Sequence, residues 1–188
     1  GFGRTGSMFA HQQAGIRPDF ICLSKGLTGG TLPLSAVLTT EDVYQAFYGT
    51  DTARAFLHSH SYTGNPLACR AALATLELFE KLNALKENQE LAKQLSAAFL
   101  LTTHQRVRHA RHLGMVWAWD IDTTLPNFAQ CYHAAAKARG LLLRPIGNTL
   151  YCMPPYVLQA KEVQHLSSQM LAALEDCLAQ EAQQYPLI

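Results

Sequence analysis

One lysine in this chain stands where amine chemistry is possible. Lys25 is the only lysine among the first eighty residues, and it follows the apolar run 19–23, which is typical of a buried strand. A lysine at the end of a buried strand is costly to desolvate, which suits Schiff-base formation with an aldehyde. Gly26, Gly29 and Gly30 leave room for a flat ring beside it. The alternative is a lysine whose stem lies along apolar surface before an ordinary glycine-rich loop.

The polar loop 59–65 is a second candidate site. Its three hydroxyl side chains precede a helix that we expect to begin at Pro66, with Asn65 as the N-cap. Hydroxyls and free backbone amides ahead of a helix favour phosphate binding. The alternative is a capped loop whose hydroxyls bond only to their own backbone. His58 and His60 are close neighbours here, but no third ligand is near them, so no metal site is predicted.

Arg144 is a third candidate, because it follows three leucines and immediately precedes Pro145. We expect residues 141–144 to form a strand whose end presents the guanidinium for bidentate binding of a substrate carboxylate. Tyr151 and Tyr156 are close enough in the sequence to line the same pocket. The alternatives are a surface arginine that closes a strand and tyrosines that serve only in packing.

The elements that position the first two candidates are short. Strands are expected at 19–23 and 35–39, with the lysine loop between them. From Pro66 the chain is apolar on nearly every helical face, which predicts a buried helix. After a break at 82–84 a second helical face follows, formed by Leu85, Leu91, Ala92, Leu95, Ala98 and Phe99.

From about residue 103 the pattern changes to that of a smaller α+β unit. The expected elements are a hairpin of strands 107–112 and 115–120, a helix over 127–139 ended by Gly140, strands at 141–144 and 149–153, and a final helix with Val163, Leu166, Met170, Leu174 and Leu178 on one face.

Composition excludes several classes of function. The net charge of +1 and the lack of a basic stripe argue against nucleic-acid binding, and no apolar run reaches membrane-spanning length. The five cysteines are an odd number without metal-like spacing, which indicates reduced cysteines of a cytoplasmic protein. The chain opens on a glycine-rich segment without an initiator methionine, so we expect the C-terminal portion of a longer polypeptide.

Three motifs together resemble the class III, pyridoxal-phosphate-dependent aminotransferases. They are Gly1-Phe2-Gly3-Arg4-Thr5-Gly6, then Leu23-Ser24-Lys25-Gly26-Leu27-Thr28-Gly29-Gly30 after Pro18-Asp19, and Ser61-Tyr62-Thr63-Gly64-Asn65-Pro66-Leu67-Ala68. The resemblance covers essentially all 188 residues. Within the family, Leu143-Arg144-Pro145-Ile146-Gly147-Asn148, Tyr151 and Met153-Pro154-Pro155-Tyr156 look closest to the members that convert 8-amino-7-oxononanoate to 7,8-diaminononanoate in biotin biosynthesis.

The resemblance implies an α/β fold of the fold-type-I class, with part of a large cofactor domain and a small α+β C-terminal domain. Residues 1–65 would belong to the large domain, 66–102 would be bridging helices and 103–188 the small domain. The family also implies a homodimer with active sites at the interface.

The family's site residues can be assigned to positions of this chain. Lys25 would form the Schiff base with pyridoxal 5′-phosphate and then move a proton between the substrate and the cofactor. The resemblance also implies that His60 and Ser61 contact the cofactor phosphate of the partner subunit, because active sites in this family form across the dimer interface. The other implied roles are binding of the keto substrate's carboxylate for Arg144 and lining of the substrate pocket for Ser59 and Tyr151.

Two departures from the family pattern affect this assignment. The family's pyridine-nitrogen aspartate lies just upstream of the glycine–arginine motif, so we expect this chain alone to be inactive. The loop 59–63 also differs from the proline-threonine-phenylalanine form of many biotin-pathway members. The amino donor is therefore open between S-adenosylmethionine, which is typical, and lysine. Two alternatives remain. One is another class III aminotransferase, which acts on ω-amino acids or diamines, and the other is a non-catalytic dimerisation module of the same fold.

Overall fold

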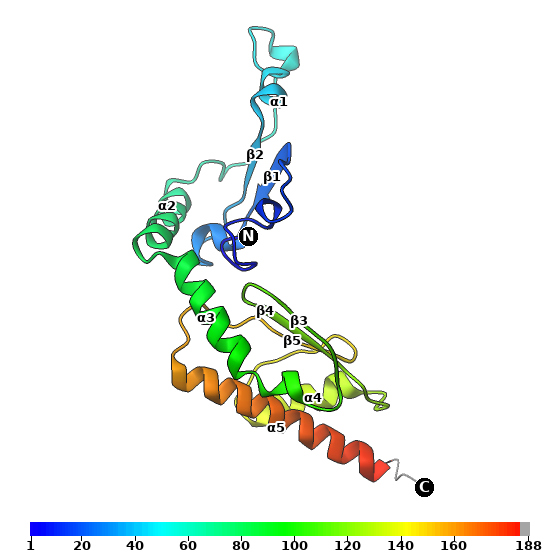
Figure 1. Cartoon of the computed structure of the whole chain (residues 1–188). Helices are drawn as coiled ribbons and strands as arrows, with labels where there is room; N and C mark the ends of the chain where they lie inside the picture. The colour runs from blue at the N-terminus through cyan, green and yellow to red at the C-terminus, as the bar shows by residue number, and fades with distance from the viewer. Residues whose placement is uncertain (185–188) are drawn as a thin grey trace. The chain divides into compact units, whose positions relative to one another are not determined.

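The computed structural model describes residues 1–184 and divides the chain into two compact units, residues 1–86 and residues from 87 onward (Figure 1). The division falls inside the stretch 66–102. The expected small domain extends to residue 188, so its end lies outside the described residues. Among the helices of the described part, none combines the length and the hydropathy that a membrane span needs.

The first unit is built from short elements around a two-stranded sheet. β1 and β2 pair antiparallel, with Phe20 opposite Thr39 and Leu23 opposite Ala36. Both strands were expected, to within one residue. The elements in chain order are η1 Ala10–Gln12, β1 Phe20–Leu23, η2 Lys25–Thr28, β2 Ala36–Thr39, α1 Glu41–Gln45, η3 Thr52–Arg54 and α2 Pro66–Lys81.

Helix α2 begins and ends where the sequence predicts. The Asn65 side chain accepts hydrogen bonds from the backbone amides of Leu67 at 3.0 Å and Ala68 at 3.1 Å, and Pro66 occupies the first helical position. The helix stops at Lys81 because Asn83 adopts a left-handed conformation with φ +50°. The predicted break at 82–84 is therefore confirmed.

The predicted burial of β1 and α2 is wrong for the described chain. Phe20 in β1 is 57% exposed, and Ala68 and Ala72 are the residues of α2 that are buried. The reason is the size of this unit's core, which is centred on Phe2, Leu27 and Ala72. A sheet of two strands has no inner strand, so few apolar side chains of this unit are removed from water.

The second unit is an antiparallel sheet covered by helices. The sheet order is β3-β4-β5, and the hairpin of β3 and β4 turns at Gly114, as predicted. Helix α3 spans the division between the two units. The elements are α3 Ala84–Ala98, η4 Leu100–Thr103, β3 Val107–Leu113, β4 Val116–Ile121, α4 Phe128–Ala138, β5 Thr149–Cys152 and α5 Ala160–Gln184.

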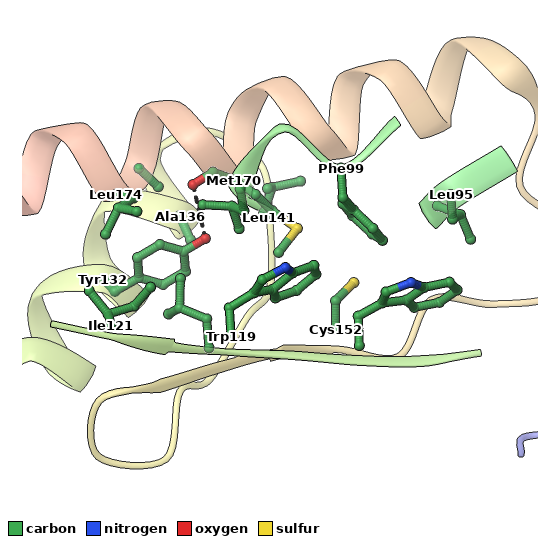
Figure 2. Packing of buried hydrophobic residues seen from close by; sticks show 14 of the residues in the cluster. Leu95, Phe99, Trp119, Ile121, Tyr132, Ala136, Leu141, Cys152, Met170 and Leu174 are labelled. Atoms are coloured by element: carbon green, nitrogen blue, oxygen red, sulfur yellow. Dashed lines mark hydrogen bonds between the residues drawn. The ribbon is translucent and has the colours of Figure 1, made fainter. Parts of the chain in front are cut away.

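Strand β4 supplies the centre of the core. Its side chains alternate, so that Trp117, Trp119 and Ile121 are buried. Figure 2 shows Trp119 and Ile121 between the sheet and α5. The Tyr132 hydroxyl donates a hydrogen bond to the Met170 carbonyl at 3.0 Å, which joins α4 to α5. The apolar face predicted for the final helix is confirmed, because it packs against this core through Val163, Leu166, Met170, Leu174 and Leu178.

The strand predicted at 141–144 does not form, although β5 does. The Leu141 amide donates to the Ala136 carbonyl at 2.9 Å and continues the C-terminal turn of α4. Imidazole Nδ1 of His133 lies 2.7 Å from the Leu143 carbonyl oxygen. Since Pro145 has no N–H, the segment has few groups left for a sheet ladder and runs as an irregular connection.

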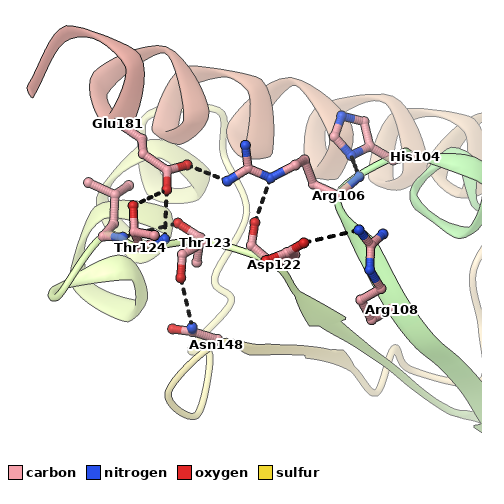
Figure 3. A network of polar contacts seen from close by, with 9 residues as sticks. His104, Arg106, Arg108, Asp122, Thr123, Thr124, Asn148 and Glu181 are labelled. Atoms are coloured by element: carbon pink, nitrogen blue, oxygen red, sulfur yellow. Dashed lines mark hydrogen bonds and ion pairs between the residues drawn. The ribbon is translucent and has the colours of Figure 1, made fainter. Parts of the chain in front are cut away.

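A polar network closes one end of this unit (Figure 3). Glu181 of α5 accepts hydrogen bonds at 2.6 Å from the Thr124 amide, the Thr124 hydroxyl and the Arg106 guanidinium. Burial of Glu181 acts to raise its pKa, but the hydrogen bonds from Thr124 and the charge of Arg106 outweigh burial, so its pKa lies below the ordinary value. The carboxylate is therefore ionised and fully paired.

Candidate active site

Lys25 lies at the junction between β1 and the 3-10 helix η2, and its backbone is strained. Its φ is +51°, in the left-handed region that residues with a Cβ rarely adopt. The side chain is exposed, so the predicted burial of this lysine is wrong for the described chain, for the same reason as that of β1. Within residues 1–184 its amine forms no ion pair, so the group is accessible and uncommitted.

The glycines after Lys25 have separate structural tasks. A Cβ on Gly26 would lie 2.8 Å from a ring carbon of Phe2, so the missing side chain lets the Phe2 ring pack against the backbone. Gly29 ends η2 with φ +61°. Gly30 has φ +80° and open space around it. The space at Gly26 thus accommodates the protein's own ring, and Gly30 is the glycine that leaves room for another group.

Each unit contains a cavity, of about 640 Å³ in the first unit and about 430 Å³ in the second. The cavity of the first unit lies between the lysine loop and the loop 59–65. It is lined by Ser24, next to Lys25, and by His60, Thr63 and Asn65 of the second candidate loop. Ser59 and Ser61 are exposed and are not among its lining residues. The structure therefore brings His60 beside the lysine loop and leaves the two serines at the surface.

Hydrogen bonds inside the loop decide which of its groups are free. The Thr63 hydroxyl accepts a hydrogen bond from the His60 amide at 3.0 Å. This hydroxyl therefore bonds to the backbone of its own loop, as in the alternative of a loop without a ligand. The Tyr62 amide donates to Nδ1 of His60 at 3.1 Å. Because Nδ1 accepts, this pattern assigns the proton to Nε2, which makes His60 a donor suited to an anion.

The second unit holds Arg144 and Tyr151 together in a cavity of about 430 Å³, whereas Tyr156, which was expected to line the same pocket, is not among its lining residues. Glu162 and His165 of α5 line it as well. The Glu162 carboxylate accepts a hydrogen bond from the Gln159 amide at 2.7 Å, at the N-terminus of α5. The helix terminus thus offsets the negative charge of Glu162, and the guanidinium remains available for an incoming carboxylate.

His133 does not line this cavity but contacts the segment that carries Arg144, and the sequence did not indicate it. It projects from α4 to the Leu143 carbonyl, and it supplies the side-chain hydrogen bond to the segment that carries Arg144. Arg144 follows that carbonyl directly, so His133 helps to fix where the guanidinium lies. A contact over ten residues between a helix and an irregular connection leaves no periodic signal in the sequence.

The described residues contain no candidate metal-binding site. No group of three or more His, Cys, Asp or Glu side chains gathers there in a way that could hold a metal ion. The first cavity offers the imidazole of His60 and the second the guanidinium of Arg144, while the amine of Lys25 follows Ser24, a lining residue of the first cavity.

Comparison with known proteins shows the family to which this chain belongs. Residues 1–174 match the family model for class-III aminotransferases. The chain therefore belongs to the class-III aminotransferase family, and the predicted resemblance is confirmed.

Within this family, the chain is most usefully compared with two curated relatives. The chain is 46% identical over 183 residues to the adenosylmethionine-8-amino-7-oxononanoate aminotransferase of Helicobacter pylori, with 94% of this chain covered. It is 47% identical over 182 residues to the protein of the same name from Synechococcus elongatus, with 95% covered. The chain spans 42% of the length of each relative.

Solved structures show the same fold. The crystal structure of the enzyme of that name from Methanocaldococcus jannaschii matches with a TM-score of 0.82 at 35% identity, covering 94% of this chain and 44% of that one. The omega transaminase of Pseudomonas jessenii, solved in complex with PMP, matches with a TM-score of 0.85 at 25% identity, covering 97% and 43%. The predicted α/β, fold-type-I class is confirmed.

Proposed function

We propose that this chain is the lysine-bearing part of a pyridoxal-phosphate-dependent aminotransferase of biotin biosynthesis. The reaction is the amination of 8-amino-7-oxononanoate to 7,8-diaminononanoate, with S-adenosylmethionine as the amino donor. The observation that carries the proposal is Lys25, whose accessible amine stands on a strained backbone at φ +51° in a chain of this family. Backbone strain of this kind persists where function requires it.

The groups of the first unit fit the proposed cofactor. Lys25 offers an unpaired amine, Gly30 leaves open space next to the loop, and His60 offers an N–H donor at the adjoining cavity. In the proposed dimer, His60 and the exposed Ser61 would hold the phosphate of the pyridoxal 5′-phosphate bound in the partner subunit. When bound, this cofactor supplies an electron sink for the pair of electrons left at the substrate carbon.

The residues of this chain would then act on the substrate. Lys25 would remove the proton from the substrate carbon that bears nitrogen and return it as a general acid. Arg144 would bind the carboxylate of the keto substrate as a bidentate pair, with Tyr151 lining the same cavity. Ser59, which is exposed in the first unit, would line the substrate pocket of the assembled enzyme. His133 would fix the backbone from which Arg144 projects.

We further propose a cytoplasmic homodimer with active sites at the interface. Large apolar side chains of the first unit are exposed to solvent, including Phe56 at 71%, Leu57 at 87% and Leu67 at 73%. Exposed apolar surface of this kind favours contact with further protein surface. All five cysteines are free, which fits a reducing compartment. Light scattering on the full-length protein would test the dimer.

A substrate comparison tests the proposed reaction. In the full-length enzyme, we expect turnover with 8-amino-7-oxononanoate and S-adenosylmethionine, and little with 4-aminobutyrate or ornithine semialdehyde. Arg144→Lys keeps the charge and removes the bidentate fork, so it should raise KM for the keto acid by about tenfold or more. Faster turnover of 4-aminobutyrate would instead favour an ω-amino acid aminotransferase. Turnover with lysine in place of S-adenosylmethionine would change only the donor.

A further inference from the structure

Two cysteines of the second unit, Cys131 and Cys177, have their sulfur atoms close together, and the proposed transamination uses neither of them. Sγ of Cys131 in α4 is 2.6 Å from Sγ of Cys177 in α5. A disulfide bond has a length of roughly 2.05 Å, so the two sulfur atoms need to approach each other by only about 0.5 Å to form one. The two residues are 46 positions apart, and both thiols are free.

The two thiols differ in their access to solvent. Cys177 is completely buried, whereas Cys131 is partly exposed and lines a shallow cavity on the surface of α4 and α5. Its sulfur also lies 3.3 Å from the side-chain oxygen of Gln180. A small oxidant can therefore reach Cys131 and cannot reach Cys177 directly.

We propose that Cys131 and Cys177 form a reversible redox site, in which a hydroperoxide oxidises the accessible thiol and the buried thiol resolves it into a disulfide. The site takes hydrogen peroxide or a small organic hydroperoxide as its oxidant. It is independent of the proposed transamination, because neither cysteine lines the cavity of Arg144 or that of His60.

The chemistry balances in two steps. The deprotonated Cys131 sulfur attacks one peroxide oxygen, the O–O bond breaks, and the released hydroxide takes up the thiol proton as water, which leaves a sulfenic acid. The Cys177 sulfur then attacks the sulfenic sulfur, the S–O bond breaks, and the hydroxide leaves as a second water with the Cys177 proton. Two thiols and one hydrogen peroxide thus give one disulfide and two waters.

The electrostatics of Cys177 agree with the order of these steps. Burial raises the pKa of its thiol, and the neighbouring Cys131 raises it further. The Cys177 thiol is therefore protonated in the reduced protein. A protonated resolving thiol reacts slowly, so we expect the second step to become faster as the pH rises.

Peptide mapping after peroxide treatment tests the site in the longest available form of the protein. Trypsin places the five cysteines on five different peptides, which are 5–25, 55–70, 112–137, 140–161 and 162–188. After alkylation of the remaining thiols, we expect a species made of peptides 112–137 and 162–188, lighter than their sum by two hydrogens. The species should disappear on reduction.

Variants separate this site from random oxidation. Cys177→Ser, or Cys177→Ala if the serine variant does not fold, should remove the linked peptides and leave a sulfenic acid on Cys131 that a dimedone probe captures. Cys22→Ser, which changes an exposed thiol of the other unit, should leave the linkage unchanged. Cross-linking should also raise Tm by roughly 5–15 °C, an increase that Cys131→Ser abolishes.

The proposal is overturned if Cys131 and Cys177 are both recovered alkylated after peroxide treatment. It is also overturned if the linkage forms equally well in denaturant, because the folded geometry would then have no part in it. Neither result bears on the transamination, which is measured separately with substrate.

Discussion

Lys25 combines an accessible amine with a backbone conformation that a residue with a Cβ adopts at a cost. The sequence identified this residue from its position between an apolar strand and a glycine-rich loop. It did not show the left-handed φ, because the neighbours of Lys25 do not by themselves determine its backbone angles. Strain at the proposed catalytic residue implies that stability and function compete at this position.

Two substitutions at Lys25 test this competition. Both Lys25→Gly and Lys25→Ala remove the amine, so we expect both variants to be inactive. Glycine adopts φ +51° freely and alanine does not, so the glycine variant should have the larger free energy of unfolding, by about 1 kcal/mol. Urea denaturation measures the difference. An alanine variant that is as stable as the glycine variant would show that the position is not strained.

His133 carries a second prediction at this scale. Removal of its hydrogen bond to Leu143 in His133→Ala should let the segment of Arg144 shift, and KM for the keto substrate should rise roughly two- to tenfold with kcat nearly unchanged. His133→Asn, which can still donate, should restore part of the affinity. His109→Ala changes an exposed histidine away from that cavity and serves as the control. An equal loss in kcat would place His133 in another role.

Local signals predicted most of the individual elements. The start of α2 at Asn65 and Pro66, the hairpin around Gly114 and the apolar face of α5 each follow from a capping, turn or periodic pattern. The failure at 141–144 has a different cause. An apolar run of three leucines fits a strand, but the hydrogen bonds of α4 and His133 engage its backbone groups.

The C-terminus of α4 allows a prediction about one element. Gly140 has φ +79°, and no atom lies within 4 Å of the place that an added methyl group would occupy, so its requirement is conformational and not steric. Gly140→Ala should lower the free energy of unfolding by about 1 kcal/mol. Gly49→Ala, where space is equally open and φ is not left-handed, should be nearly neutral. Thermal unfolding of both variants would check this, and equal effects would contradict it.

At the scale of the whole molecule, the two units differ in how they are stabilised. The second unit has an extensive core of aromatic and aliphatic residues, while the first has a small core and many exposed apolar side chains. Sequence periodicity shows which residues are apolar, but not whether a neighbouring surface covers them. For this reason the burial of β1 and α2 was mispredicted while their positions were correct.

The acid stability of the second unit should depend on Glu181. Its pKa is depressed in the folded state, so its contribution is present above the unfolded pKa of about 4.3 and is lost as the pH falls through the lower folded pKa. Glu181→Gln should cost about 2 kcal/mol at pH 7 and progressively less below about pH 4. Glu77→Gln, at an exposed carboxylate paired with Arg70, should barely change the pH profile of stability. A cost for Glu181→Gln that does not vary with pH would contradict this account.

The most direct test of the central claim is to trap pyridoxal phosphate on Lys25. The longest available form of the protein would be incubated with pyridoxal 5′-phosphate, reduced with borohydride and mapped by mass spectrometry. We predict a phosphopyridoxyl group on peptide 5–54, which contains Lys25 as its single lysine and which trypsin leaves uncut at the modified residue. The Lys25→Ala variant should lack it. No adduct in the full-length protein, or an adduct spread over other lysines, would contradict the proposed function and favour a non-catalytic module of the same fold.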